Sequence, residues 1–149
     1  MKVEAQTHVD APLEPVWKVI TDIEGAGETI HAIEELEVLE KPESGLVGLK
    51  WRETRTVFGK TATETMWITE AVENDFYKTR AESHGCVYLT TLSVSEEEGG
   101  TLLRMSLKGE AQTFGAKLMS AVFSVFFKGG MRKAIEQDLA DIKATVEAG

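Results

Sequence analysis

Residues 48–110 alternate apolar and polar side chains through consecutive stretches separated by turn-forming residues, and this alternation constrains the fold more than any other feature. Side chains point to alternate faces along a strand, so such a pattern predicts strands with one buried face and one solvated face. The expected turns lie at Gly59-Lys60, Glu73-Asn74, His84-Gly85 and Glu98-Gly99. The segment is therefore predicted to form an antiparallel meander of five strands.

The predicted turns fix which residues face one another across the meander. The first turn places Arg55 opposite Glu64 and Glu53 opposite Met66. Other pairs predicted on the same inner face are Trp51 with Ile68, Ile68 with Thr79, Met66 with Ala81, Ala81 with Tyr88, Thr79 with Thr90, Tyr77 with Leu92, Leu92 with Met105 and Thr90 with Leu107. A shift of the pairing by one residue would exchange the faces of the next strand, so this consistency supports the register as well as the strands.

The inner face is predicted to be apolar except for one polar cluster, which consists of Glu53, Arg55 and Glu64. Buried charges without partners are costly, so the predicted Arg55–Glu64 apposition is either a structural ion pair in a wet cavity or an anchor for a ligand. If Glu53 lies beside Met66 without a partner, its carboxyl is a candidate general acid or base. These three charged residues are the candidate catalytic residues.

The segments outside the meander complete the predicted secondary structure. Residues 3–9 alternate like a strand, and Pro12 and Pro15 then occupy the first turn of a short helix that ends before Gly25. A weak second helix or a loop follows over residues 25–30, and another strand is expected over about residues 34–40.

A long helix is predicted over about residues 113–146, because apolar residues return at helical spacing at Leu118, Val122, Val125, Ile135, Leu139, Ile142 and Val146. A bend is expected at Gly129-Gly130, since glycine in a helix interior costs about 1 kcal/mol. The second half of the helix is expected to present a polar face that carries Arg132, Lys133, Glu136, Asp138, Asp141 and Lys143.

Composition limits the classes of partner. The net charge of -9 and the pI near 4.9 oppose nucleic acid or an anionic membrane surface as the main partner. No apolar run reaches the roughly 20 residues that a membrane span requires, so we expect a cytoplasmic protein without integral membrane association, formed by one domain over residues 1–149. No cofactor is expected, and His84 with Cys86 supplies too few ligands for a metal site.

The order of a strand, two short helices, a long meander and one long C-terminal helix resembles the helix-grip fold of the START-related, polyketide cyclase/dehydrase-like (SRPBCC) superfamily. The resemblance covers nearly the whole chain and is carried by Ala11-Pro12, Val16-Trp17, Asp22, Val47-Gly48, Ile68-Thr69-Glu70, Gly99-Gly100-Thr101, Asp138-Leu139 and Ile142-Lys143. It implies an α+β fold in which a curved antiparallel sheet of six to seven strands wraps around the C-terminal helix, with two short helices after the first strand.

Members of this superfamily enclose an apolar cavity between sheet and helix, which serves lipids, sterols, quinones or polyketides and in some members catalysis. Residues 25–31 lack the aromatic residue and the proline that often line the portal in the family, so the resemblance implies a wider or more mobile entrance. His31 lies in this segment and is expected to be a solvated loop histidine.

Three functional hypotheses follow. The first is binding of an apolar or amphipathic small molecule by Trp51, Met66, Ile68, Tyr77, Thr79, Tyr88, Thr90, Leu92, Met105, Leu107, Met119, Phe123 and Phe127, with the polar cluster orienting its polar end. The second is a cyclase or dehydratase in which Glu53 or Glu64 removes a proton and Arg55 or Tyr88 stabilises the enolate. The third is a protein-docking module with a filled interior. The sequence leaves the oligomeric state open.

Overall fold

The computed structural model describes residues 1–57, 59–83 and 85–149, together with their side chains other than those of residues 57 and 116–129. The elements are β1 (Lys2–Val9), α1 (Leu13–Thr21), the 3-10 turn η1 (Ile23–Gly25), α2 (Ala26–Thr29), β2 (Ile33–Glu40), β3 (Lys50–Val57), β4 (Lys60–Val72), β5 (Phe76–Ser83), β6 (Cys86–Glu97), β7 (Gly100–Ala111) and α3 (Phe114–Ala148). The predicted elements are all present, and the expected second helix is a single turn, α2.

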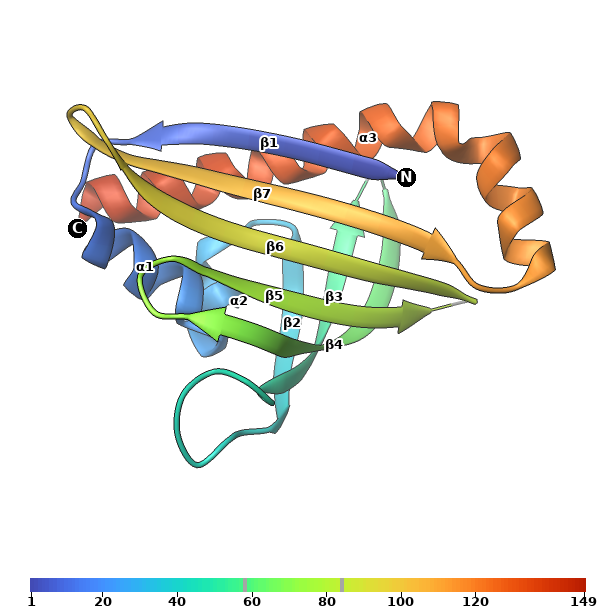
Figure 1. The fold of residues 1–149 in the computed structure, drawn as a ribbon, viewed down its shortest axis with the longest axis horizontal. Helices are drawn as coiled ribbons and strands as arrows, with labels where there is room; N and C mark the ends of the chain where they lie inside the picture. Colours follow the sequence, from blue (N-terminus) through green and yellow to red (C-terminus); the bar gives the residue numbers. More distant parts are fainter. Residues whose placement is uncertain (58, 84) are drawn as a thin grey trace.

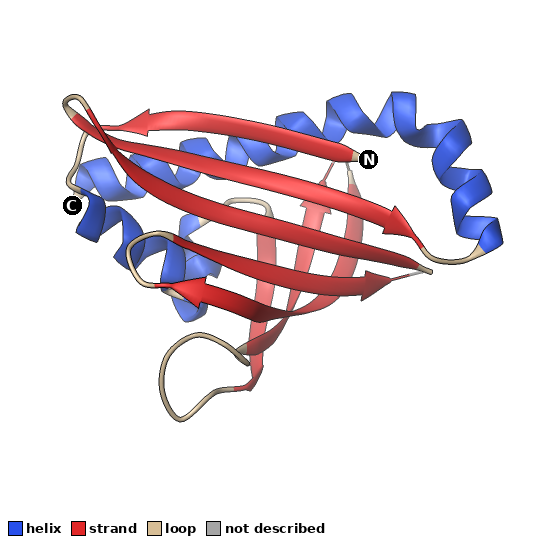
Figure 2. Cartoon of the chain, viewed as in Figure 1, coloured by secondary structure: helices blue, strands red, loops and turns tan. Residues whose placement is uncertain are grey.

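The strands form one curved antiparallel sheet in the order β1-β7-β6-β5-β4-β3-β2 (Figure 1). The first strand forms one edge of the sheet beside the last strand, because β1 pairs with β7 along its whole length, and β2 forms the other edge. Helix α3 runs along this sheet and packs against β1 and β7, and its C-terminal part lies beside α1 (Figure 2). This arrangement confirms the predicted α+β helix-grip fold of a curved sheet around a C-terminal helix.

The predicted register of the meander is confirmed from β4 to β7. Thr79 lies opposite both Ile68 and Thr90, and Leu92 lies opposite both Tyr77 and Met105. A β-bulge between Ile68 and Glu70 interrupts the β4–β5 pairing and adds to the curvature of the sheet. The inner face proposed from the alternation is therefore the concave face that meets α3.

The predicted register of the first hairpin is wrong. Arg55 lies opposite Ala62, and Glu53 lies opposite Glu64. Val57 pairs with Lys60, so the turn lies one residue earlier than predicted, with Gly59 at a φ of 76° that glycine adopts at little cost. Moving a turn by one residue shifts the pairing by two, which leaves every side chain on its predicted face.

The C-terminal part of α3 supplies much of the core. Its apolar stripe is buried as predicted and consists of Ile135, Leu139, Ile142 and Val146. The prediction of a polar face is wrong for Asp138 and Asp141, both of which are buried. Asp138 follows Ile135 by three residues and precedes Ile142 by four, so helical geometry places it on the apolar side.

Helix α3 is bent, with its beginning at an angle to the remainder (Figure 1). The apolar residues predicted for its first half, among them Leu118, Val122 and Val125, lie outside the described side chains. Among the described residues, no helix is both long enough and apolar enough to cross a membrane.

Candidate functional site

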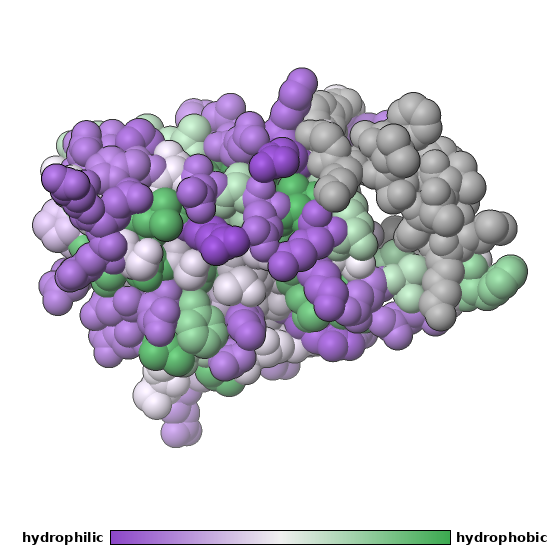
Figure 3. All heavy atoms as spheres, turned by 45° about the horizontal axis from the view of Figure 1, so that its top comes forward, coloured by the Kyte–Doolittle hydropathy of each residue, from purple (hydrophilic) through white to green (hydrophobic). Residues whose placement is uncertain are grey.

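A cavity of about 1330 Å³ lies between the concave face of the sheet and the helices. Strands β2 to β7 line it on one side, while α1, α2 and the C-terminal part of α3 line it on the other. This volume exceeds the roughly 300–1,000 Å³ that sites for small molecules occupy. The outer surface seen in Figure 3 is by contrast largely hydrophilic, with hydrophobic side chains in small groups.

Most residues predicted to contact a ligand line this cavity. The structure brings together Trp51, Met66, Tyr77, Thr79, Tyr88, Thr90, Leu92, Met105 and Leu107. Ile68 is buried in the hydrophobic core and is absent from the described lining. Met119, Phe123 and Phe127 lie outside the described side chains.

The predicted charged residues Glu53, Arg55 and Glu64 all line the cavity, but their contacts differ from the prediction. Arg55 donates through Nε to Glu53 Oε2 at 2.8 Å and through Nη1 to Asp138 Oδ2 at 2.8 Å. Glu53 also accepts a hydrogen bond from Trp51 Nε1 at 3.3 Å, so it is not the unpartnered carboxylate that the sequence suggested. We call Glu53, Arg55 and Asp138 the buried charge trio.

Asp138 is the residue that the sequence reasoning missed. Asp138 lies in α3, 83 positions from Arg55 in the chain, and its carboxylate accepts a hydrogen bond from Arg55. It thereby forms the part of the site that the helix contributes. The signal that could have found it is its spacing from Ile135 and Ile142, which places a carboxylate inside the apolar stripe of the helix.

The charge trio is deeply placed, since Glu53 and Asp138 are each 4% exposed. Burial lowers the pKa of Arg55, but the charges of Glu53 and Asp138 outweigh it and raise the pKa, so the guanidinium stays protonated. Burial raises the pKa of Asp138 above its ordinary value of 3.8, and the charge of Arg55 opposes this only in part. Asp138 Oδ1 is buried with no hydrogen-bond partner among the described residues.

Two tyrosines place phenol groups in the cavity wall. Tyr77 donates its hydroxyl to the carbonyl oxygen of Ile20 at 2.9 Å, and burial together with the charge of Glu53 raises its pKa. Burial also raises the pKa of Tyr88, to which its neighbours Cys86 and Glu64 contribute. Both phenols therefore remain protonated and can donate hydrogen bonds but not act as phenolate bases.

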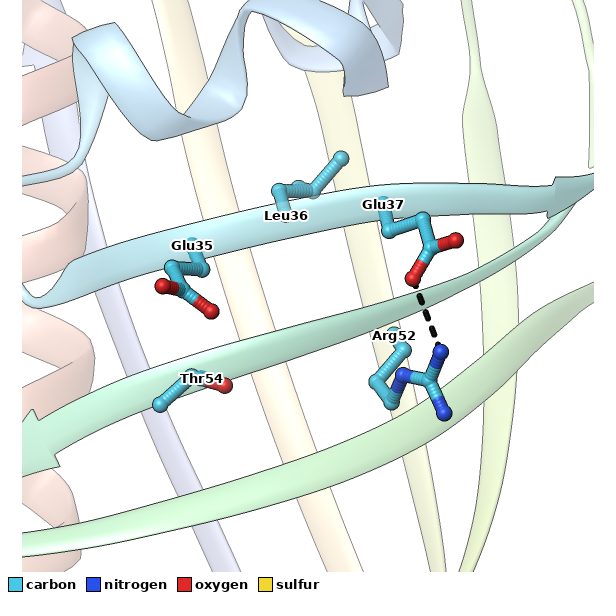
Figure 4. A pocket seen from close by; sticks show the side chains of 5 residues that line it. All are labelled: Glu35, Leu36, Glu37, Arg52 and Thr54. Atoms are coloured by element: carbon cyan, nitrogen blue, oxygen red, sulfur yellow. Dashed lines mark hydrogen bonds and ion pairs between the residues drawn. The ribbon is translucent and has the colours of Figure 1, made fainter.

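A second depression of about 350 Å³ lies on the convex face of the sheet (Figure 4). Its polar lining comes from β2 and β3, with Arg52 Nη2 paired to Glu37 Oε2 at 2.8 Å, while Leu36 points away from this pair. The ion pair is exposed to solvent and the depression lacks an apolar wall. A ligand would therefore gain little binding free energy there.

Asp141 of α3 binds His31, which lies in the segment that follows α2. Its carboxylate accepts hydrogen bonds from the His31 backbone N–H at 2.9 Å and from Gln137 Nε2 at 2.9 Å, and it pairs with His31 Nδ1 at 2.9 Å. His31 is solvated as predicted, whereas Asp141 is buried. Because Thr29 and Ile30 of the adjoining segment line the cavity, this contact holds one part of the cavity wall.

Replacing Asp141 with asparagine should lower the free energy of unfolding by about 1–2 kcal/mol at neutral pH, because a buried charged acceptor is lost. Burial raises the pKa of Asp141, but the hydrogen bonds from His31 and Gln137 outweigh it, so the pKa lies below 3.8. This stabilisation is present above the unfolded pKa and is lost as the pH falls through the folded one. Urea denaturation from neutral pH downwards checks this, with the exposed Glu136→Gln as control, and a pH-independent difference would contradict it.

Comparison with known proteins places this architecture. The family model described as polyketide cyclase / dehydrase and lipid transport matches residues 1–147. No curated protein matches significantly. Among solved structures, the protein TTHA0849 from Thermus thermophilus is 20% identical with a TM-score of 0.82, over 99% of this chain and 98% of that one.

Two further structures share the fold. A START superfamily protein from Mycobacterium smegmatis is 16% identical with a TM-score of 0.75, over 99% of this chain and 97% of that one. The di-domain ARO/CYC BexL from the BE-7585A biosynthetic pathway is 14% identical with a TM-score of 0.82, over 100% of this chain and 50% of that one. The chain therefore has the helix-grip fold of SRPBCC proteins and belongs to the polyketide cyclase/dehydrase and lipid transport family.

Proposed function

We propose that the protein binds an apolar or amphipathic small molecule of the lipid, quinone or polyketide type in the cavity between sheet and helices. The observation that carries this proposal is a cavity of about 1330 Å³ with a largely apolar wall and one buried charge cluster. Ligand sites of proteins share this design, in which apolar walls supply affinity and a few convergent polar groups fix orientation.

In this proposal the roles follow from the contacts. Trp51, Met66, Leu92, Met105 and Leu107 provide apolar walls on the sheet side. The guanidinium of Arg55 orients the polar end of the ligand, and Glu53 and Asp138 hold that guanidinium in place through the two hydrogen bonds it donates.

A bulky side chain introduced into the cavity wall should weaken binding. Thr90 lines the cavity, so Thr90→Trp should weaken binding of a neutral fluorescent probe such as N-phenylnaphthylamine by at least about tenfold, or about 1.4 kcal/mol. Thr91 precedes the wall residue Leu92 and lies on the opposite face of β6, so Thr91→Trp is the matched control. Equal binding by both variants would contradict the proposal.

The natural ligand can be sought directly. Native mass spectrometry of the protein from its own host, followed by organic extraction, should reveal a stoichiometric apolar adduct that Thr91→Trp retains and Thr90→Trp loses. A clean unliganded mass in repeated preparations would count against a carrier.

A second candidate function is catalysis of a cyclisation or dehydration. The observation that favours it is Asp138, a carboxyl with a raised pKa that lines the cavity beside Arg55. Such a carboxyl can take a proton from a carbon next to a carbonyl, while Arg55 stabilises the developing enolate oxygen. The test is conversion of the extracted ligand, which Asp138→Asn should abolish while an apolar probe still binds.

The protein-docking hypothesis required a filled interior. The cavity of about 1330 Å³ counts heavily against a filled interior and therefore against this hypothesis.

A further inference from the structure

The positive charge of Arg55 is already shared between two carboxylates. Its Nε and Nη1 atoms each donate a hydrogen bond of 2.8 Å, to Glu53 and Asp138 respectively. Both carboxylates are almost fully buried, so water screens this arrangement little. With both carboxylates ionised, the buried charge trio carries one negative charge in excess.

The hydrogen bonds of the trio leave one nitrogen atom of the Arg55 guanidinium, Nη2, for a ligand. The described contacts give Nη2 of Arg55 no partner, and the side chain is 29% exposed and lines the cavity. Nη2 can therefore donate to an oxygen atom of a bound molecule. In such a contact the positive charge of Arg55 is already balanced by Glu53 and Asp138, so the guanidinium is not available as a counter-ion for the ligand.

Other described charges of the cavity wall do not reverse this balance. Glu64 and Glu110 are acidic, and the basic residue Lys60 is exposed at the β3–β4 turn. Glu110 is paired with Lys108 at 3.0 Å near the end of β7. A carboxylate brought to Arg55 would thus become a third anion around one cation at low dielectric.

From this arrangement we infer that the cavity selects an apolar molecule whose polar end is an uncharged hydrogen-bond acceptor, such as a ketone or quinone carbonyl, over a carboxylate of the same length. The inference rests on the proposed function and narrows its ligand class. A carbonyl oxygen accepts from Nη2 of Arg55 without adding charge, whereas a fatty-acid carboxylate meets the uncompensated negative charge of Glu53 and Asp138.

Two further observations support an excess of negative charge at this place. Asp138 Oδ1 lacks a hydrogen-bond donor among the described residues, so half of that carboxylate is uncompensated. The pKa of Asp138 is raised, by burial first and also by the charges of Glu53 and Asp141, although Arg55 lies in contact. Both are signs that the site would resist another anion.

The test compares two ligands of equal chain length, methyl decyl ketone and dodecanoate, by displacement of N-phenylnaphthylamine at neutral pH. The ketone should bind more tightly to the wild type. The ratio alone is not decisive, because a carboxylate is also better hydrated than a ketone. The decisive quantity is the change in that ratio when a negative charge of the trio is removed.

Asp138→Asn removes one negative charge and keeps an oxygen that can accept from Arg55. It should reduce the preference for the ketone by about tenfold or more, mainly through tighter binding of dodecanoate. Glu53→Gln removes the other negative charge, should act in the same direction, and serves if Asp138→Asn fails to fold. Glu136→Gln removes a negative charge on the exposed side of α3 and should leave the ratio unchanged.

The outcomes separate the inference from the proposed function. If ketone and carboxylate both bind with a ratio that Asp138→Asn and Glu53→Gln leave unchanged, the charge selection is overturned and ligand binding stands. If the probe and both ligands fail to bind the wild type, the proposed function is overturned, and the selection with it.

Discussion

Replacing Arg55 with methionine should lower the free energy of unfolding by about 3 kcal/mol or more at neutral pH. The guanidinium is the shared partner of two carboxylates that are each 4% exposed, so its removal leaves two negative charges buried together. Methionine retains much of the aliphatic packing of arginine. The loss of stability can therefore be attributed to the lost charge and hydrogen bonds. Urea denaturation of the wild type and the variant, fitted with one common m value, measures this difference in the free energy of unfolding.

The same strand offers a matched control. Arg52 in β3 makes an ion pair of 2.8 Å with Glu37, but on the solvated face of the sheet. Because exposed ion pairs contribute about 0–1 kcal/mol, Arg52→Met should change stability by no more than that. If Arg55→Met costs as little as Arg52→Met, the charge trio is not the buried cluster described above.

The effect of Arg55→Met should depend on pH. Without Arg55, the attraction that holds down the pKa of Asp138 is gone, and its folded pKa rises further above the unfolded value. A carboxyl of this kind loses stability as the pH rises through its folded pKa, so the destabilisation should be larger at about pH 8 than at about pH 5. A larger effect at the lower pH would contradict this assignment.

A triple variant separates the ion pair from its geometry. In Glu53→Gln/Arg55→Met/Asp138→Asn no charge remains at the site, so much of the lost stability should return. Ligand binding should not return with it, because the proposed donor to the ligand is Arg55 itself. Recovery of binding in the triple variant would show that the apolar wall alone holds the ligand.

Much of the meander could be predicted from the sequence because its turns are marked by residues with particular backbone needs. Asn74, Gly85 and Gly99 have positive φ angles, and the pairings predicted from the turns that contain them are confirmed. At the first hairpin, Gly59 suits either of two turn placements that differ by one residue. Both keep the inner face apolar, so alternation could not choose between them.

The candidate site was predictable where it breaks the pattern of a strand. Glu53 and Arg55 stand out because they occupy inner positions of β3 among apolar neighbours. Asp138 lies in a helix, where the boundary between buried and exposed faces depends on how the helix is rotated against the sheet. Its contact with Arg55 joins segments 83 residues apart, and no local pattern specifies such a contact.

Replacing Leu139 with alanine should lower the free energy of unfolding by about 3 kcal/mol. This side chain is 2% exposed in the packed core between α3 and the rest of the fold. Leu92→Ala is the informative comparison. Leu92 is also buried, at 6% exposed, but it lines the cavity, so part of its surface borders open space and it has fewer contacts to lose. Its truncation should therefore cost less.

The two variants should also differ in how they affect the site. Leu139 is adjacent to Asp138 in α3, so the loss of its packing should loosen the helix that presents Asp138 to Arg55, and Leu139→Ala should weaken probe binding as well as stability. Leu92→Ala only enlarges a cavity that is already present, and binding of a bulky apolar probe should persist. Urea denaturation and probe titration of both variants decide the matter. Equal losses of stability would mean that the side of β6 that lines the cavity is packed as tightly as the core. Such packing is incompatible with a cavity that holds a ligand.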